Sequence, residues 1–81
     1  MRIKIKFFSL LREEVGISER EIEVKEGLRI RDIFDLLEVD DLRRRVNTGG
    51  VLISRNFEYS DPDIELREGD EIALFPPVSG G

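Results

Sequence analysis

The residues best suited to chemistry lie at the C-terminal end of the sequence, after an apolar run that closes at Phe75. They read Pro76-Pro77-Val78-Ser79-Gly80-Gly81. Proline fixes φ and has no backbone N–H, so the two prolines are expected to end a strand and stiffen the start of the tail. Glycine has no Cβ, so the last two residues can enter a narrow slot close to another protein's backbone. The reactive group on offer is the α-carboxylate of Gly81, and the rest of the chain would then be a handle that presents it.

A second explanation of this ending is equally open on spacing alone. Terminal glycine and serine often indicate only a frayed chain end without chemistry. Pro76, Pro77 and Val78 follow directly on a predicted strand, which is not typical of a sequence left over from an expression vector. The ending must therefore be judged together with the elements that position it.

Composition removes most catalytic options from the chain itself. There is no cysteine, hence no disulfide, no thiolate nucleophile and no thiolate metal site. There is also no histidine, the usual general base near neutral pH and the commonest metal ligand. We therefore expect no metal site, no bound cofactor and no stand-alone enzyme. The net charge of −5 argues against nucleic acid or an anionic membrane as a partner.

The length of 81 residues indicates one domain with a modest core and little room for a deep cleft. No apolar run approaches the roughly 18 residues of a membrane span, and no signal-peptide core follows Met1. We therefore expect a cytoplasmic protein.

Two alternating segments open the chain. In residues 1–8, Ile3 and Ile5 share one face and Lys4 shares the other with further basic residues, the period of a half-buried strand. Residues 20–25 alternate again, with an acidic outer face. An antiparallel pair would place the acidic face beside the basic one.

Residues 28–39 change to a helical period and predict a core-facing helix without a good N-cap side chain. Its apolar stripe would consist of Ile30, Ile33, Phe34, Leu36 and Leu37.

A second, shorter predicted helix ends at the run Arg43-Arg44-Arg45. The three arginines could dock an acidic partner, but a solvated helix end is the favoured interpretation.

These elements, with short strands after residue 50, predict an α+β roll. One mixed sheet of four to five strands would wrap around one main helix, with the first and last strands as central neighbours. Residues 1–75 would form the domain and residues 76–81 a flexible C-terminal tail.

An aromatic patch is predicted on the outer face of the sheet. Phe8 shares parity with Lys4, and Phe75 shares parity with Glu71, so both would lie outside the core. Adjacent first and last strands would bring them together, with Tyr59 nearby. A cluster of exposed aromatics beside a protruding tail suggests a partner interface. The alternative is that Phe8 merely covers the edge of a short helix predicted directly after it, at Leu10 and Leu11.

With these features together, the sequence resembles the MoaD/ThiS sulfur-carrier family of ubiquitin-like β-grasp proteins over essentially its whole length. The resemblance rests on the segments Phe7–Glu13 with Gly16, the central helix, and Leu66–Gly81. The paired prolines make the ending more like that of the small subunit of molybdopterin synthase than that of the thiamine carrier. The poorly capped helix and the arginine run depart from the usual pattern.

The resemblance implies a chemistry for Gly81. An ATP-dependent enzyme of the ubiquitin-activating type would adenylate its carboxylate, and a sulfur donor would displace AMP to leave a thiocarboxylate. Residues Pro76–Gly80 would lie in the pocket of the large subunit of molybdopterin synthase, forming a hetero-oligomer. There the sulfur would pass to cyclic pyranopterin monophosphate in molybdenum cofactor biosynthesis.

Other functions fit the same ending. An activated Gly81 could instead be attacked by a lysine, which would make the chain a ubiquitin-like protein modifier. Sulfur could also be carried to thiazole synthesis for thiamine. A ubiquitin-like interaction module with an inert tail is a further alternative, and it predicts that truncation is harmless.

Overall fold

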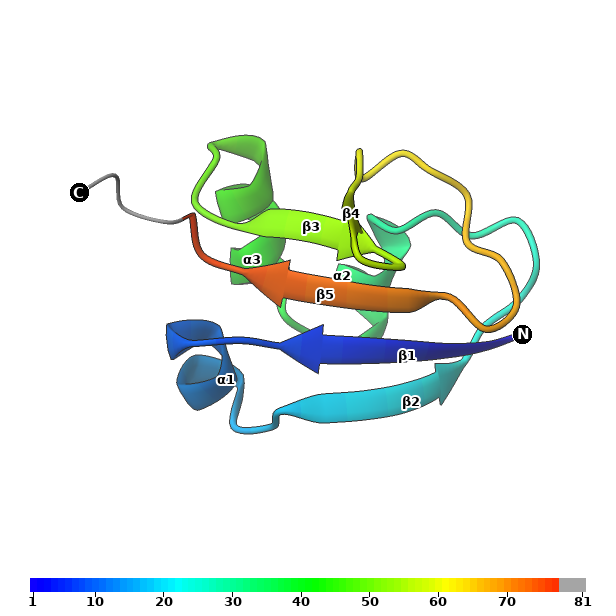
Figure 1. The fold of residues 1–81 in the computed structure, drawn as a ribbon, viewed down its shortest axis with the longest axis horizontal. Helices are drawn as coiled ribbons and strands as arrows, with labels where there is room; N and C mark the ends of the chain where they lie inside the picture. Colours follow the sequence, from blue (N-terminus) through cyan, green and yellow to red (C-terminus); the bar gives the residue numbers. More distant parts are fainter. Residues whose placement is uncertain (78–81) are drawn as a thin grey trace.

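The computed structural model describes residues 1–77, whose strands form one mixed five-stranded sheet in the order β2-β1-β5-β3-β4 (Figure 1). The two central strands, β1 and β5, run parallel, and the other pairs are antiparallel. The bounds are Arg2–Phe7 for β1, Glu19–Glu23 for β2, Leu52–Arg55 for β3, Glu58–Tyr59 for β4 and Glu71–Phe75 for β5. The predicted α+β roll, with its first and last strands side by side, is confirmed.

Within residues 1–77, three short helices accompany the sheet: α1 (Leu10–Val15), α2 (Asp32–Leu36) and α3 (Asp40–Asn47). Helices α2 and α3 lie together behind one face of the sheet, whereas α1 sits at the end where β1 finishes (Figure 1). Helix α1 stops at Gly16, which adopts the left-handed conformation and donates its N–H to the Arg12 carbonyl at 2.9 Å. The opposite face of the sheet carries no helix among residues 1–77.

The helix predicted over residues 28–39 is much shorter in the structure, where α2 has five residues. Its predicted first turn does not form, because Arg29 makes an isolated β-bridge with Glu65 and the Leu28 carbonyl accepts the Leu66 N–H at 2.8 Å. Backbone groups paired with the later loop cannot also form helical hydrogen bonds. Leu36 does not join the core, since 51 % of it is exposed.

The core lies between the inner face of the sheet and the helices. Alternation along β1 and β5 places Ile3, Ile5, Ile72 and Leu74 in it, each fully buried. The helical side contributes Leu11, Ile30, Ile33, Phe34 and Leu42. The apolar residues predicted from the strand period and those predicted from the helical period therefore pack together in one core.

Two features of other protein classes can be assessed for residues 1–77. No helix in this range has the length and apolar character needed to cross a membrane. The same residues contain no group of three or more side chains arranged to hold a metal ion.

Candidate functional site

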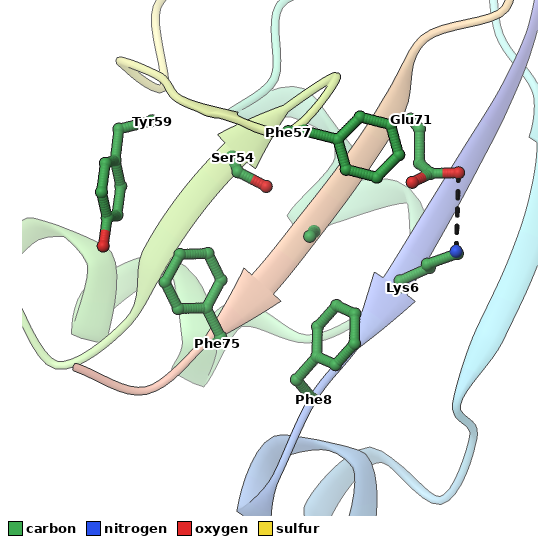
Figure 2. Close-up of a pocket in the computed structure, with 8 residues that line it drawn as sticks. Lys6, Phe8, Ser54, Phe57, Tyr59, Glu71 and Phe75 are labelled. Carbon is green, nitrogen blue, oxygen red and sulfur yellow. Dashed lines mark ion pairs between the residues drawn. The ribbon is translucent and has the colours of Figure 1, made fainter. Parts of the chain in front are cut away.

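The outer face of the sheet contains an apolar hollow of about 430 Å³, shown in Figure 2. Its floor consists of two small residues, Ala73 of β5 and Ser54 of β3, which are direct cross-strand partners. Larger side chains surround this floor, namely Lys6, Phe8, Phe57, Tyr59, Glu71 and Phe75. The hollow exists because two small residues in the middle of the sheet are flanked by four aromatic rings.

The parallel pairing of β1 and β5 brings Phe8 and Phe75 together as predicted. The Phe8 N–H donates to the Leu74 carbonyl at 3.0 Å, which continues the β1–β5 pairing one residue past the end of β1. Phe8 is 45 % exposed, and its ring lies beside that of Phe75 at one end of the hollow (Figure 2). Tyr59 reaches Phe75 from β4, with ring centroids 5.8 Å apart. The predicted placement of all three rings is confirmed, and their role in partner binding stays a prediction.

Phe57 forms a further wall of the hollow, a position that its place in the sequence does not predict. Residues 57–59 look like a short strand, but Phe57 occupies the two-residue turn between Arg55 and Glu58. Positive φ values at both turn residues, +50° at Asn56 and +72° at Phe57, define a type I′ hairpin. The Asn at the first turn position is the signal for this turn, but the expected glycine after it is absent.

One ion pair lies at the edge of the hollow, between Lys6 and Glu71, whose side-chain atoms Nζ and Oε1 are 3.6 Å apart (Figure 2). Both residues stand on the outer face by the alternation of β1 and β5. The pair neutralises the charged edge of an otherwise apolar surface. Among residues 1–77, the two charged side chains that line the hollow are thus paired with each other.

A buried carboxylate fastens the Phe57 turn to the start of β5. Asp70 is 3 % exposed, and its Oδ2 accepts from Arg55 Nε at 3.0 Å and from the Arg67 N–H at 2.8 Å. Its Oδ1 accepts from Asn56 Nδ2 at 3.1 Å. Burial would raise the pKa of Asp70, but the hydrogen bonds from Arg67, Asn56 and Arg55 outweigh burial and lower its pKa. Asp70 is therefore a charged residue that holds the turn in place beside the site, rather than a proton donor.

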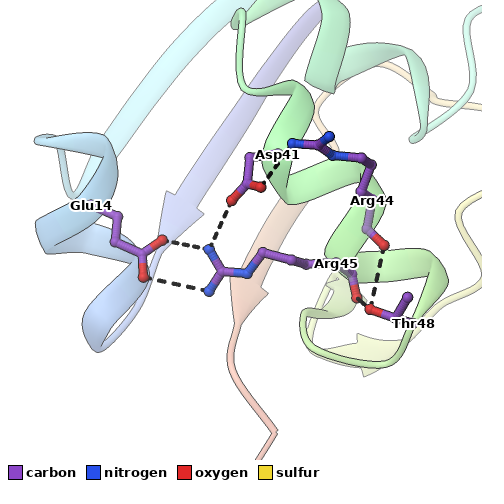
Figure 3. Close-up of polar contacts among 5 residues, drawn as sticks. All are labelled: Glu14, Asp41, Arg44, Arg45 and Thr48. Carbon is purple, nitrogen blue, oxygen red and sulfur yellow. Dashed lines mark hydrogen bonds and ion pairs between the residues drawn. The ribbon is translucent and has the colours of Figure 1, made fainter.

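The arginines of α3 form ion pairs within the chain. Arg45 Nη1 lies 2.5 Å from Glu14 Oε2 and 3.3 Å from Asp41 Oδ2, which ties α3 to α1 (Figure 3). Arg44 pairs with Asp41 at 3.1 Å. The hydrogen bond with Glu14 raises the pKa of Arg45. With Arg43 also paired, to Asp35 at 2.6 Å, the run supports the interpretation as a helix end rather than a docking patch.

The C-terminal segment leaves the sheet beside the hollow. Strand β5 ends at Phe75, as the two prolines predict, and the half-buried Pro76 and exposed Pro77 continue the chain. The other predicted site residues, Val78, Ser79, Gly80 and Gly81, lie outside the described residues. The structure thus brings Phe8, Tyr59 and Phe75 to the root of the segment that carries Gly81.

Comparison with known proteins finds a family and relatives that match nearly the whole chain. The sequence model of the ThiS family matches residues 5–81. The chain is 34 % identical to the molybdopterin synthase sulfur carrier subunit of Escherichia coli, with 98 % of this chain and 99 % of the relative covered. It is similar to a putative molybdopterin converting factor subunit 1 from Pyrococcus furiosus (31 % identity, TM-score 0.75, covering 96 % of this chain and 99 % of the other). It is also similar to Haloferax volcanii small archaeal modifier protein 1 (26 % identity, TM-score 0.75, covering 95 % and 98 %).

Proposed function

Because the chain belongs to the ThiS family, we propose that it is the sulfur carrier subunit of a molybdopterin synthase. The observation that carries this proposal is the match to curated sulfur carrier subunits over 98–100 % of the chain. The chain's own Pro-Pro-Val-Ser-Gly-Gly ending supports it. The chain is not catalytic alone. It supplies the group that is activated, and the partners supply the nucleotide site and the catalytic residues.

The proposed chemistry begins by making the Gly81 carboxylate electrophilic. A carboxylate resists nucleophiles because it is negatively charged and oxide is a poor leaving group. A carboxylate oxygen therefore attacks the α-phosphorus of ATP on an adenylating enzyme, and the bond to pyrophosphate breaks. A hydrosulfide equivalent then adds to the carbonyl carbon and expels AMP, which leaves the thiocarboxylate. This sulfur then attacks a carbon of cyclic pyranopterin monophosphate, and a carbon–oxygen bond at that carbon breaks, the oxygen leaving with its electron pair. Water cleaves the resulting thioester, which leaves the sulfur on the pterin and restores the Gly81 carboxylate.

In this chemistry, residues Pro76–Gly80 form a narrow segment that carries Gly81 into the partners' pockets. Gly80 and Gly81 add no Cβ, so they pass where a side chain would collide with backbone on both sides. The two prolines limit the conformations that must be lost when the segment is bound. In this proposal residues 76–81 act as a segment separate from the domain of residues 1–75.

The hollow around Phe8, Tyr59 and Phe75 is the proposed docking surface for the large subunit. Residues 78–81 span at most about 14 Å when fully extended. A partner that takes Gly81 into a pocket must therefore bring its surface close to Pro77, and hence to the aromatic rings beside β5. Exposed aromatic clusters of this kind commonly anchor protein interfaces. The assembly is then a hetero-oligomer, and its expected location is the cytoplasm.

Intact-mass measurement tests the proposal directly. The chain is incubated with ATP, its adenylating enzyme and sulfide, and we expect a gain of about 16 Da as one oxygen is replaced by sulfur. The Gly81→Ala variant is the matched control, and we expect its sulfuration to fall by about a hundredfold, because a misplaced carbonyl reacts poorly. Its melting temperature should not change. No mass gain in the unaltered chain would contradict the carrier function, and full sulfuration of the variant would contradict the steric role of the glycines.

A second mass-spectrometric measurement, on cell lysates, separates sulfur carriage from protein modification. The similarity to a small archaeal modifier protein keeps conjugation as the second candidate, at lower identity than the synthase relative. Digested lysates would show Gly-Gly remnants on target lysines if conjugation is the function. Carriage to thiazole would instead appear as sulfur in the thiamine precursor.

A further inference from the structure

Phe57 is an unusual residue for the place it occupies. It stands second in the type I′ turn with φ +72°, where glycine is preferred because a Cβ is strained in the left-handed region. Its side chain is 84 % exposed, the highest value among the large apolar residues of the described chain. The aromatic side chain therefore strains the backbone and gains almost no burial within its own domain. A residue that costs stability without packing indicates a role outside the fold.

The turn that carries Phe57 is tightly fixed. The Asn56 side chain donates to Asp70 Oδ1 at 3.1 Å and accepts the Glu71 N–H at 2.9 Å through its own Oδ1. The Asn56 backbone N–H also donates to the Glu71 carbonyl at 2.8 Å. Three hydrogen bonds from one turn residue to the start of β5 hold the hairpin tip against the sheet. The direction in which Phe57 projects is thus set before any partner arrives.

The ring of Phe57 lines the same hollow as Phe8 and Phe75, on the side toward Glu71 (Figure 2). The C-terminal segment leaves from the other end, beside Phe75. A partner that covers the exit and also contacts Phe57 must extend across the small floor residue Ala73. An apolar side chain of that partner would then sit between the two aromatic walls, where Ala73 and Ser54 leave room for it.

We propose that Phe57 is a recognition residue for the large subunit of molybdopterin synthase and that Asn56 is the positioning residue that aims it. This inference rests on the proposed function, because it assumes that the hollow is the docking surface. It assigns the far wall of that surface to a turn rather than to the sheet. It also explains why an aromatic stands where the backbone prefers glycine.

The first test replaces Phe57 by glycine and measures binding to the large subunit from the same organism by calorimetry. Phe57→Gly creates the Asn-Gly pair preferred in type I′ turns, so we expect the melting temperature to be maintained or to rise by up to about 5 °C. Over the same substitution the dissociation constant should rise by about tenfold or more. Opposite signs for stability and affinity support the proposal. Affinity unchanged within about twofold, or affinity lost together with a lower melting temperature, overturns it.

The second test asks whether Asn56 acts through Phe57. Asn56→Gly keeps the positive φ but removes both side-chain hydrogen bonds, so the hairpin tip should loosen and the dissociation constant should rise by about fivefold. In the Phe57→Gly background the same change should have almost no effect on affinity. A purely structural role for Asn56 would give the same loss of affinity in both backgrounds, and that result overturns the positioning role.

Two control variants separate this inference from the proposed function. Leu36→Ala removes an exposed apolar side chain on α2, away from the outer face, and should leave affinity unchanged. Phe75→Ala should weaken binding if the hollow is the docking surface at all. Weakening by Phe75→Ala without weakening by Phe57→Gly refutes only the role of Phe57. No effect from either variant refutes the docking surface itself.

Discussion

The outer face of the sheet has two halves. They belong to the same sheet but differ in whether their side chains find partners within the chain. Over β1 and β2, basic and acidic residues alternate across the strands. Arg2 lies 3.2 Å from Glu23, and Lys4 lies 3.4 Å from Glu19. This half forms its interactions within the chain and presents only solvated charge.

The half over β5, β3 and the hairpin turn is different. It carries aromatic walls around a floor of small residues, and an ion pair between Lys6 and Glu71 lies at its edge. No helix of residues 1–77 covers it. Exposure alone therefore does not mark a binding surface in this protein. The property that distinguishes the proposed docking surface is apolar area that the chain leaves uncovered beside the exit of its C-terminal segment.

The largest effect is expected from filling the apolar half. Ala73→Leu places a larger side chain on the floor of the hollow, so we expect binding to the large subunit to weaken by about 3 kcal/mol, or roughly a hundredfold. The melting temperature should stay the same or rise, because the new side chain contacts the aromatic rings. Calorimetry and thermal unfolding of one preparation measure both quantities. Normal affinity would show that no partner group enters the hollow and that the two halves do not differ in binding.

The hydrogen bonds of buried Asp70, beneath the hairpin, should contribute more to stability than the ion pairs on the surface do. Asp70→Asn removes a buried charge that accepts three hydrogen bonds, so the free energy of unfolding should fall by about 2 kcal/mol. Denaturant titration at neutral pH measures this loss. An unchanged midpoint would mean that the buried network contributes no net stability.

The same carboxylate predicts how stability depends on pH. Its pKa is lower in the folded chain than the usual Asp value near 3.9. Its stabilising contribution is therefore complete above about pH 4 and is lost as the pH falls through the lower folded value. Asp70→Asn should remove this acid-dependent part. Identical acid profiles for both proteins would contradict the assignment.

Within the apolar half, a single aromatic should matter for binding more than for folding. Phe75→Ala should weaken partner binding by at least about 1 kcal/mol, because in the proposed docking surface this ring would be an anchor at the exit of the segment. The melting temperature should remain nearly unchanged. A large fall in melting temperature with intact binding would place Phe75 in the core instead.

The smallest effect is expected in the charged half. Glu21 lies 4.0 Å from Arg2, and its side chain is 53 % exposed. Glu21→Gln should therefore change the free energy of unfolding by less than about 0.5 kcal/mol, and partner binding should not change. A clear loss of affinity would extend the docking surface over β2 and erase the distinction between the two halves.

Local signals along the chain were sufficient for the elements that depend on near neighbours. Alternation along residues 1–8 and 71–75 specified which side chains of β1 and β5 face the core, because successive side chains in a strand point to opposite faces. The same parity put Phe8 and Phe75 outside. The prolines marked the end of β5 because they cannot continue a ladder.

Features that depend on distant partners required the folded structure. Residues 28–31 pair with the loop around residue 65 instead of starting a helix, and no local period reveals that competition. The direction of Phe57 depends on hydrogen bonds that the Asn56 side chain donates to Asp70 and accepts from the Glu71 N–H, fourteen and fifteen positions away. A local pattern records the preference of each residue. The hollow forms only when separate strands pair and place small side chains beside large ones on the same face of the sheet.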